Sequence, residues 1–267
     1  MRQANQLFRI TLKSGLVFAC LACISLLRMQ AESSDTPSIA EQYLLAAANQ
    51  ERASRGLSKL AWDPILAHAA AFHADQMADH DSISHEFPGE PDLSVRGANA
   101  GVRFSLISEN VAEASDSVMI HDMWMHSEGH RANLLDPNVN VVGISVTIRN
   151  QQLYAVEDFA STVESLSLNE QESTVASLIA RSGLTVASSE EAKIQDARQT
   201  CIMPSGYAGS HKPWFIMRYT ASSLSELPQE LKTRLSSGKY HQALVGACPA
   251  ADVGPFSAYN IAVLLYP

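Results

Sequence analysis

The segment W-M-H-S-E-G-H-R-A-N-L-L, from Trp124 to Leu135, carries the densest structural signal in the chain. Trp124 ends an apolar helical pattern, and Gly129 is predicted to break it just before a short turn that begins at His130. An aromatic anchor, a break in a helix and a titratable ring within seven residues are typical of a pocket wall. The alternative is a plain helix end with a solvated His130, and this segment alone leaves both interpretations open.

Three helices are predicted before this segment. Ser38 is the N-cap candidate of the first, which runs to about residue 55. Asp63-Pro64 combines an N-cap with proline at the first helical position and starts the second, which runs to about residue 80. Its apolar face includes His73 and His80, which we interpret as edge residues that bond to backbone or carboxylate. Ser115 is the expected cap of the third helix, whose inward residues are Val118, Met119, Met123 and Trp124.

Strand patterns follow the segment. Residues 140–148 and 152–160 are rich in β-branched or alternating apolar residues, and 149–151 between them predict a hairpin turn. Residues 82–103 hold several Pro and Gly and form a long loop with about a turn of helix, and long loops in compact domains are often functional. The first half is therefore α+β.

The polar stretch 161–171 marks a boundary, so we expect one domain at 38–160 and a smaller α+β region at 161–267. Strand candidates in the second region are 214–219, 240–248 and 257–266. The sequence L-V-G-A-C…A-Y-N-I-A-V-L-L there parallels V-V-G-I-S…L-Y-A-V-E-D-F in the first half. A second hairpin of similar shape and a chance likeness both remain open.

The first thirty-one residues have the pattern of a secretory signal peptide. Basic residues precede a thirteen-residue apolar run, from Gly15 to Leu27, which is short for a membrane span. Ala31 is the expected last residue before cleavage, and an uncleaved anchor is the alternative. Lipid attachment at Cys20 or Cys23 lacks a convincing flanking motif. We therefore expect a secreted or extracytoplasmic protein with no stable membrane insertion after cleavage.

Charge and cysteine content narrow the function classes. Cleavage would remove four basic residues and no acidic one, which changes the formal net charge from −9 to −13. An acidic chain without a basic run is a poor ligand for nucleic acid. Cys201 and Cys248 would be the remaining cysteines, and in an oxidising compartment we expect them to form a disulfide worth about 4 kcal/mol. Two buried free thiols are the alternative.

Three residues stand out as candidates for chemistry: His85, Glu109 and His130, which come from three separate loops or helix ends. Two imidazoles and a carboxylate could hold zinc with an open position, or act as a general acid and base. The pair His126 and His130 does not form an H-E-x-x-H motif. The sequence has no G-x-S-x-G, P-loop or dinucleotide fingerprint.

Residues 38–160 resemble the CAP superfamily (cysteine-rich secretory proteins, antigen 5 and pathogenesis-related proteins), in its bacterial secreted branch. The matching motifs, in order, are N-Q-E-R-A, L-A-W-D-P-I-L-A-H-A-A-A, S-H, S-E-N-V-A, the segment from Trp124 and V-G-I-S-V with Y-A-V-E-D-F-A. The resemblance implies an α-β-α sandwich around an antiparallel sheet. It also implies a central cleft with two His and two acidic residues that can hold a divalent metal, often zinc, and His85, Glu109 and His130 match three of these positions.

The fourth cleft position departs from the family. Ser127 stands where the second acid is expected, and the neighbouring Glu128 lies at a helix end from which it should point elsewhere. We therefore expect a binding or interaction module for a protein, peptide or lipid ligand rather than an enzyme. The first alternative is a metal-assisted hydrolase of peptide or ester bonds that uses His85, Glu109 and His130. The second is a carrier of lipid or small apolar ligands in grooves between helices.

Overall fold

The computed structural model describes residues 36–187, 191–249 and 254–267. The predicted signal peptide at 1–31, its cleavage site and the candidate lipid acceptors Cys20 and Cys23 lie outside the described residues. In the part of the chain that is described, no helix has the length and apolar character needed to cross a membrane.

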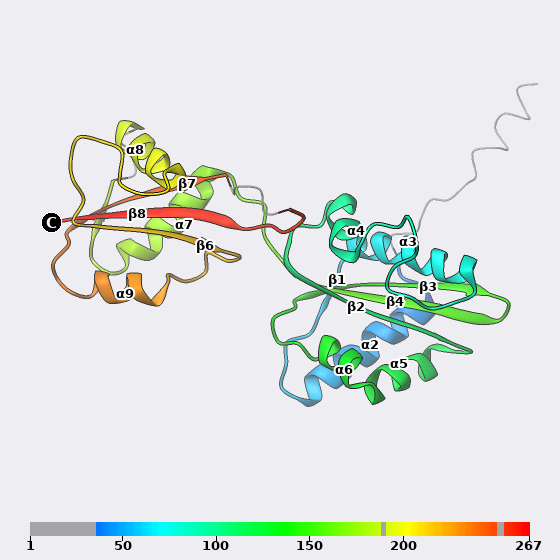
Figure 1. Cartoon of the computed structure of the whole chain (residues 1–267). Coiled ribbons are helices and arrows are strands. Elements are labelled where there is room, and N and C mark those ends of the chain that lie inside the picture. The colour runs from blue at the N-terminus through cyan, green and yellow to red at the C-terminus, as the bar shows by residue number, and fades with distance from the viewer. Residues whose placement is uncertain (1–35, 188–190, 250–253) are drawn as a thin grey trace, which may run out of the picture. The chain divides into compact units, whose positions relative to one another are not determined.

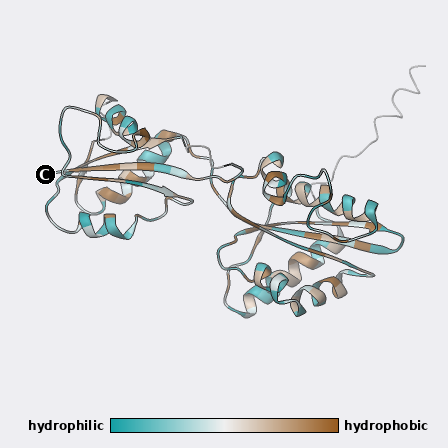
Figure 2. Ribbon diagram, in the orientation of Figure 1, coloured by the Kyte–Doolittle hydropathy of each residue, from teal (hydrophilic) through white to brown (hydrophobic). Residues whose placement is uncertain are grey.

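The first sheet has four strands in the order β1-β3-β4-β2 (Figure 1). The short β1 is parallel to β3, and the other pairs are antiparallel. Hydrophobic residues run along β3 and β4 (Figure 2), which form the predicted hairpin. Their turn holds Asn150 and Gln151 at positive φ, as a tight hairpin requires. The strand bounds are Ala61–Trp62 (β1), Phe104–Ala114 (β2), Val141–Arg149 (β3) and Gln152–Thr162 (β4).

Helices cover both faces of this sheet. One core forms where Leu44, Ile120, Trp124 and Leu134 of three helices pack against β3 and β4. On the other face α3 lies so close to Gly143 that an added Cβ would be 2.3 Å from the backbone nitrogen of Ala67. The predicted α-β-α sandwich is confirmed. The helices are α2 (Ile39–Ser54), α5 (Ser117–His126) and α6 (Glu128–Leu134) on the first face, and α3 (Pro64–His80) with α4 (Leu93–Ala100) on the second.

The first two predicted helix starts are confirmed. Ser38 caps α2 through a capping box with Glu41, and Asp63 caps α3 by accepting from the backbone nitrogens of Ile65 and Leu66. At the far end of α2, the buried guanidinium of Arg52 donates to the carbonyls of Leu134 and Asp136, at 2.9 and 2.8 Å. These bonds fix the end of α6 to α2.

Three local predictions were wrong. Gly129 does not break the helix: it lies inside α6, and the break is at Ser127, whose backbone is extended. Asp116, not Ser115, caps α5. Val118, Met119 and Met123 are 59%, 49% and 44% exposed instead of inward, because Ile120 and Trp124 form the buried stripe of α5.

The second sheet repeats the strand order of the first, as β5-β7-β8-β6, with a short parallel β5 and antiparallel pairs elsewhere. One of its cores joins α7 and α9 to the sheet, and another joins Ala197 of α8 to Leu244 and Leu264. Of the two alternatives left open for residues 240–266, the structure shows a second antiparallel strand pair, β7 with β8. The elements are α7 (Leu168–Ala180), β5 (Thr185–Val186), α8 (Glu191–Ile202), β6 (Phe215–Ala221), α9 (Gln229–Leu235), β7 (Gln242–Cys248) and β8 (Tyr259–Tyr266).

The helix-to-sheet contact of the second sheet also repeats that of the first. A Cβ on Gly246 would lie 2.2 Å from the carbonyl carbon of Ala197 in α8, much as Gly143 meets α3. Cys201 of α8 is bonded to Cys248 of β7, with their Cα atoms 5.8 Å apart, so the predicted disulfide is confirmed. This bond ties α8 to the sheet.

Candidate functional site

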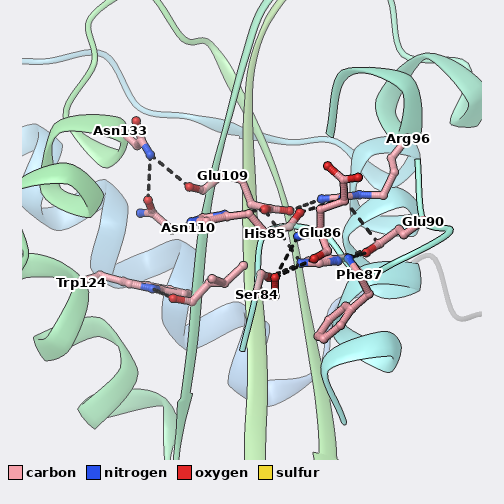
Figure 3. Close-up of polar contacts among 12 residues, drawn as sticks. Ser84, His85, Glu86, Phe87, Glu90, Arg96, Glu109, Asn110, Trp124 and Asn133 are labelled. Atoms are coloured by element: carbon pink, nitrogen blue, oxygen red, sulfur yellow. Dashed lines mark hydrogen bonds and ion pairs between the residues drawn. The ribbon is translucent and has the colours of Figure 1, made fainter. Parts of the chain in front are cut away.

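The site is built around the edge strand β2, where Glu109 and Asn110 are consecutive. Successive side chains of a strand point to opposite faces, so Glu109 faces α3 and Asn110 faces α6. Figure 3 shows Glu90 and Arg96 on one side of this strand and Asn133 and Trp124 on the other. One histidine is held on each side.

On the α3 side, Glu109 holds His85. The Nδ1 of His85 lies 2.8 Å from Oε1 of Glu109, and the guanidinium of Arg96 contacts Oε2 (Figure 3). Both oxygens of this carboxylate are therefore engaged. The side chain of Glu109 is 2% exposed, whereas that of His85 is 62% exposed. A buried carboxylate thus orients an imidazole that faces solvent.

A buried ionic network shapes the loop that carries His85. The Nδ1 of His73 lies 2.7 Å from Oε1 of Glu90, and its Nε2 lies 2.7 Å from the carbonyl oxygen of Ser84. Arg96 donates to the carbonyl of His85 at 3.2 Å and lies 3.5 Å from Glu90. The predicted role of His73 is confirmed. His80 instead stacks on Phe87, with ring centroids 4.4 Å apart.

On the α6 side, Asn110 fixes the backbone of His130. Its side-chain amide donates to the carbonyl of His130 at 3.0 Å. Asn133, one turn further along α6, donates to Oδ1 of Asn110 and to the carbonyl of Glu109, both at 3.1 Å. Trp124 donates from its indole to the carbonyl of Val111 at 3.1 Å. The segment from Trp124 to Asn133 is therefore bonded directly to β2.

The two histidines differ in their electrostatics. The hydrogen bond to Glu109 raises the pKa of His85 above its ordinary value of 6.5. Partial burial and the nearby charge of His85 lower the pKa of His130. At any one pH, the ring of His85 is therefore protonated in a larger fraction of molecules than the ring of His130.

Two buried acids of β4 lie beside this site. Asp158 pairs in register with Glu109, and Glu157 with Asn110. Burial raises the pKa of Asp158 well above its ordinary value, and the charge of Glu109 raises it further. Burial also raises the pKa of Glu157 to about 8. Within the described residues, no carboxylate oxygen of Glu157 or Asp158 has a hydrogen-bond partner of normal geometry.

The structure brings together two of the three predicted residues by a direct bond, His85 and Glu109. His130 lies near enough for the charge of His85 to lower its pKa. Ser127 adds no acid, and Glu128 is exposed. The sequence interpretation missed Glu90 and Arg96, which no quoted motif includes, and it did not assign Asp158 to the site although Asp158 lies in the motif Y-A-V-E-D-F-A. The pairing of β2 with β4 places Asp158 directly opposite Glu109, so a correct prediction of that pairing would have added Asp158 to the site.

His85, Glu109 and His130 are not arranged as three ligands of one metal ion. In the described ranges, no three His, Cys, Asp or Glu side chains are placed to hold a metal ion. Glu109 is occupied by His85 and Arg96, which leaves the exposed imidazole of His85 and the half-buried imidazole of His130 as candidate ligands. A carboxylate that binds the other nitrogen of a histidine is a common arrangement behind metal ligands. The residues therefore fit at most a two-histidine site completed by water.

Comparison with known proteins gives a family match over residues 45–160, to the model described as the cysteine-rich secretory protein family. Two Bacillus subtilis (strain 168) proteins are similar over 107 residues each. The uncharacterized protein YkwD is 30% identical, over 39% of this chain and 41% of its own length. The uncharacterized membrane protein YlbC is 32% identical, over 40% of this chain and 31% of its own.

The chain therefore spans less than half the length of these curated relatives. Among solved structures, an extracellular protein containing an SCP domain from Bacillus anthracis str. Ames is 32% identical. That match covers 45% of this chain and 39% of the other, with a TM-score of 0.41. The family match and the motif order agree over the same residues. Residues 45–160 therefore form a domain of the cysteine-rich secretory protein family.

Proposed function

We propose that residues 38–160 act as a secreted binding module whose ligand contacts the imidazoles of His85 and His130. The observation that carries this proposal is the full engagement of Glu109 by His85 and Arg96. A carboxylate held in this way orients a binding group and is not free to take part in turnover itself. The ligand would be a protein, a peptide or a lipid headgroup that reaches the exposed ring of His85.

A divalent metal such as zinc would be held by His85 and His130 with water. Bound there, it would supply a Lewis acid to a ligand carbonyl, phosphate or carboxylate. Glu109 would set the tautomer of His85, because its carboxylate accepts from Nδ1 and leaves Nε2 to face outward. The metal-assisted hydrolase receives less support. Glu109 is its expected base, but both carboxylate oxygens of Glu109 are already bonded, to His85 and to Arg96.

Zinc titration by calorimetry tests the role of the histidines. We expect one weak site, which His85→Ala and His130→Ala each abolish. Glu109→Gln should lower the affinity about 10- to 100-fold, as loss of a group behind a metal ligand commonly does. His126→Ala is the matched control, because this ring is exposed and bonds to Asp122 of its own helix.

Unchanged zinc affinity in both His85→Ala and His130→Ala would remove the metal from the proposal. A screen with peptide and ester substrates is the second arm. Turnover that disappears in Glu109→Ala would reject the binding-module proposal in favour of the hydrolase.

A further inference from the structure

The two sheets share one strand order, so β2 and β6 are equivalent edge strands. In register, Glu109, Asp158 and Gly143 correspond to Arg218, Ala262 and Gly246. The glycine of each set is the one that contacts a helix backbone. The second sheet therefore has the same strand frame as the first, with Arg218 and Ala262 at the positions of Glu109 and Asp158.

The outer edge of β2 is covered. Trp124 and Asn133 donate hydrogen bonds to the carbonyls of Val111 and Glu109, which lie in β2. The helices α4, α5 and α6 also pack along this strand. Side chains thus satisfy backbone groups that a strand edge otherwise leaves unpaired.

The outer edge of β6 has no such cover. The connection from β6 to β7 contains one seven-residue helix, α9, in place of α5 and α6. Across 36–187, 191–249 and 254–267, no side chain donates to the main chain of β6. The helix α9 packs on the sheet core that includes Phe215 and Met217, and its Arg234 guanidinium lies 4.8 Å from the ring centroid of Phe215, but these contacts are made by side chains and, within the described residues, leave the main-chain groups of the edge unpaired. The Arg218 side chain turns toward α8 and its loop, where it donates to the carbonyls of Thr200 and Gly206 at 2.7 and 2.5 Å.

The sequence of β6 suits pairing with another strand. F-I-M-R-Y-T-A has no Pro or Gly and one charge, and every residue is at least partly exposed. Trp214, directly before it, is 65% exposed. An open, apolar edge of this kind recognises an extended polypeptide by main-chain hydrogen bonds, with pockets or rings that contact alternate side chains.

We propose that β6 is a docking edge that binds an extended peptide strand of another protein by β-sheet augmentation. A second copy of this chain is a poorer occupant. Arg218 is the central residue of β6, so antiparallel pairing of two copies about that centre would place two guanidinium groups opposite each other. Like charges directly opposite in a sheet are destabilising. The inference does not depend on the function proposed for the cleft.

The probe is a capped nonapeptide, Lys-Thr-Val-Thr-Val-Thr-Val-Thr-Lys. It is titrated into the isotope-labelled full chain, and the amide NMR signals of the protein are followed. We expect the signals of residues 215–221 to shift, and their outward amides to exchange with solvent about tenfold more slowly at saturation. Residues 104–114 are the internal control, because the capped edge of β2 should not respond. A peptide of the same length with Pro at the three Val positions should have no effect.

Absence of shifts in 215–221, or equal shifts in 104–114, would overturn the proposal. Equal binding of the proline peptide would also overturn it, since that peptide cannot form the main-chain ladder. Signals of β6 that change with protein concentration, without peptide, would show that a second copy occupies the edge instead.

Discussion

Replacement of Glu157 by Gln is expected to abolish a pH-dependent loss of stability. In the wild type, this one group should lower the free energy of unfolding by about 5 kcal/mol between pH 4 and pH 9. Burial raises the pKa of this carboxyl from 4.5 to about 8. The folded protein therefore keeps a proton that the unfolded chain releases above pH 4.5. The contribution of the protonated Glu157 carboxyl to the free energy of unfolding is fully present below pH 4.5, and it is lost as the pH rises to about 8.

Urea unfolding of the wild type and Glu157→Gln at pH 4, 6, 7.5 and 9 measures this effect. The stability of the variant relative to the wild type should rise steadily over that range, because glutamine does not ionise. Glu128→Gln is the control, since Glu128 is exposed. A difference between Glu157→Gln and wild type that stays constant with pH would refute a buried, protonated Glu157.

Replacement of Arg96 by Met is expected to lower the free energy of unfolding by about 3–5 kcal/mol. The side chain of Arg96 is 2% exposed and lies between the buried carboxylates of Glu90 and Glu109. Its loss would leave these acids without their shared cation and would free the carbonyl of His85. The double variant Arg96→Met, Glu109→Gln should recover part of the loss, because it removes one of the stranded charges.

Arg149→Met provides the matched control for Arg96. The Arg149 side chain pairs with Asp79 at the surface, and the two side chains are 46% and 68% exposed. Its loss should cost about 0–1 kcal/mol. Equal costs for the two arginine variants in chemical denaturation would contradict the view that the Arg96 network is a buried support of the site.

The sequence predicted those parts of the fold that have local periodicity or capping signals. The α2 and α3 starts and the β3–β4 hairpin follow from Ser38, Asp63 and the turn at 149–151. The strand β2 was missed because its polar residues Glu109 and Asn110 both point inward, one to each face, which removes the usual alternation. A strand that carries a site is hard to find by hydrophobic pattern for this reason.

Only part of the site could be named from the sequence. His85, Glu109 and His130 lie in recognisable motifs, and His85 is bonded directly to Glu109. Arg96 and Glu90 come from α4 and the loop before it, and only the tertiary fold brings them to Glu109. The repeat of strand order in the second sheet was visible as a faint hairpin likeness, but the pairing of the short β5 with β7 could not be inferred from two residues.

The central claim is that Glu109 and burial separate the two histidines, with the pKa of His85 raised and the pKa of His130 lowered. Histidine NMR titration of the wild type, Glu109→Gln and His85→Ala measures this directly. We predict a pKa above 6.5 for His85 and below 6.5 for His130, a lower His85 value in Glu109→Gln, and a higher His130 value in His85→Ala. Equal pKa values for the two rings in the wild type, with no response of His130 to His85→Ala, would contradict the account.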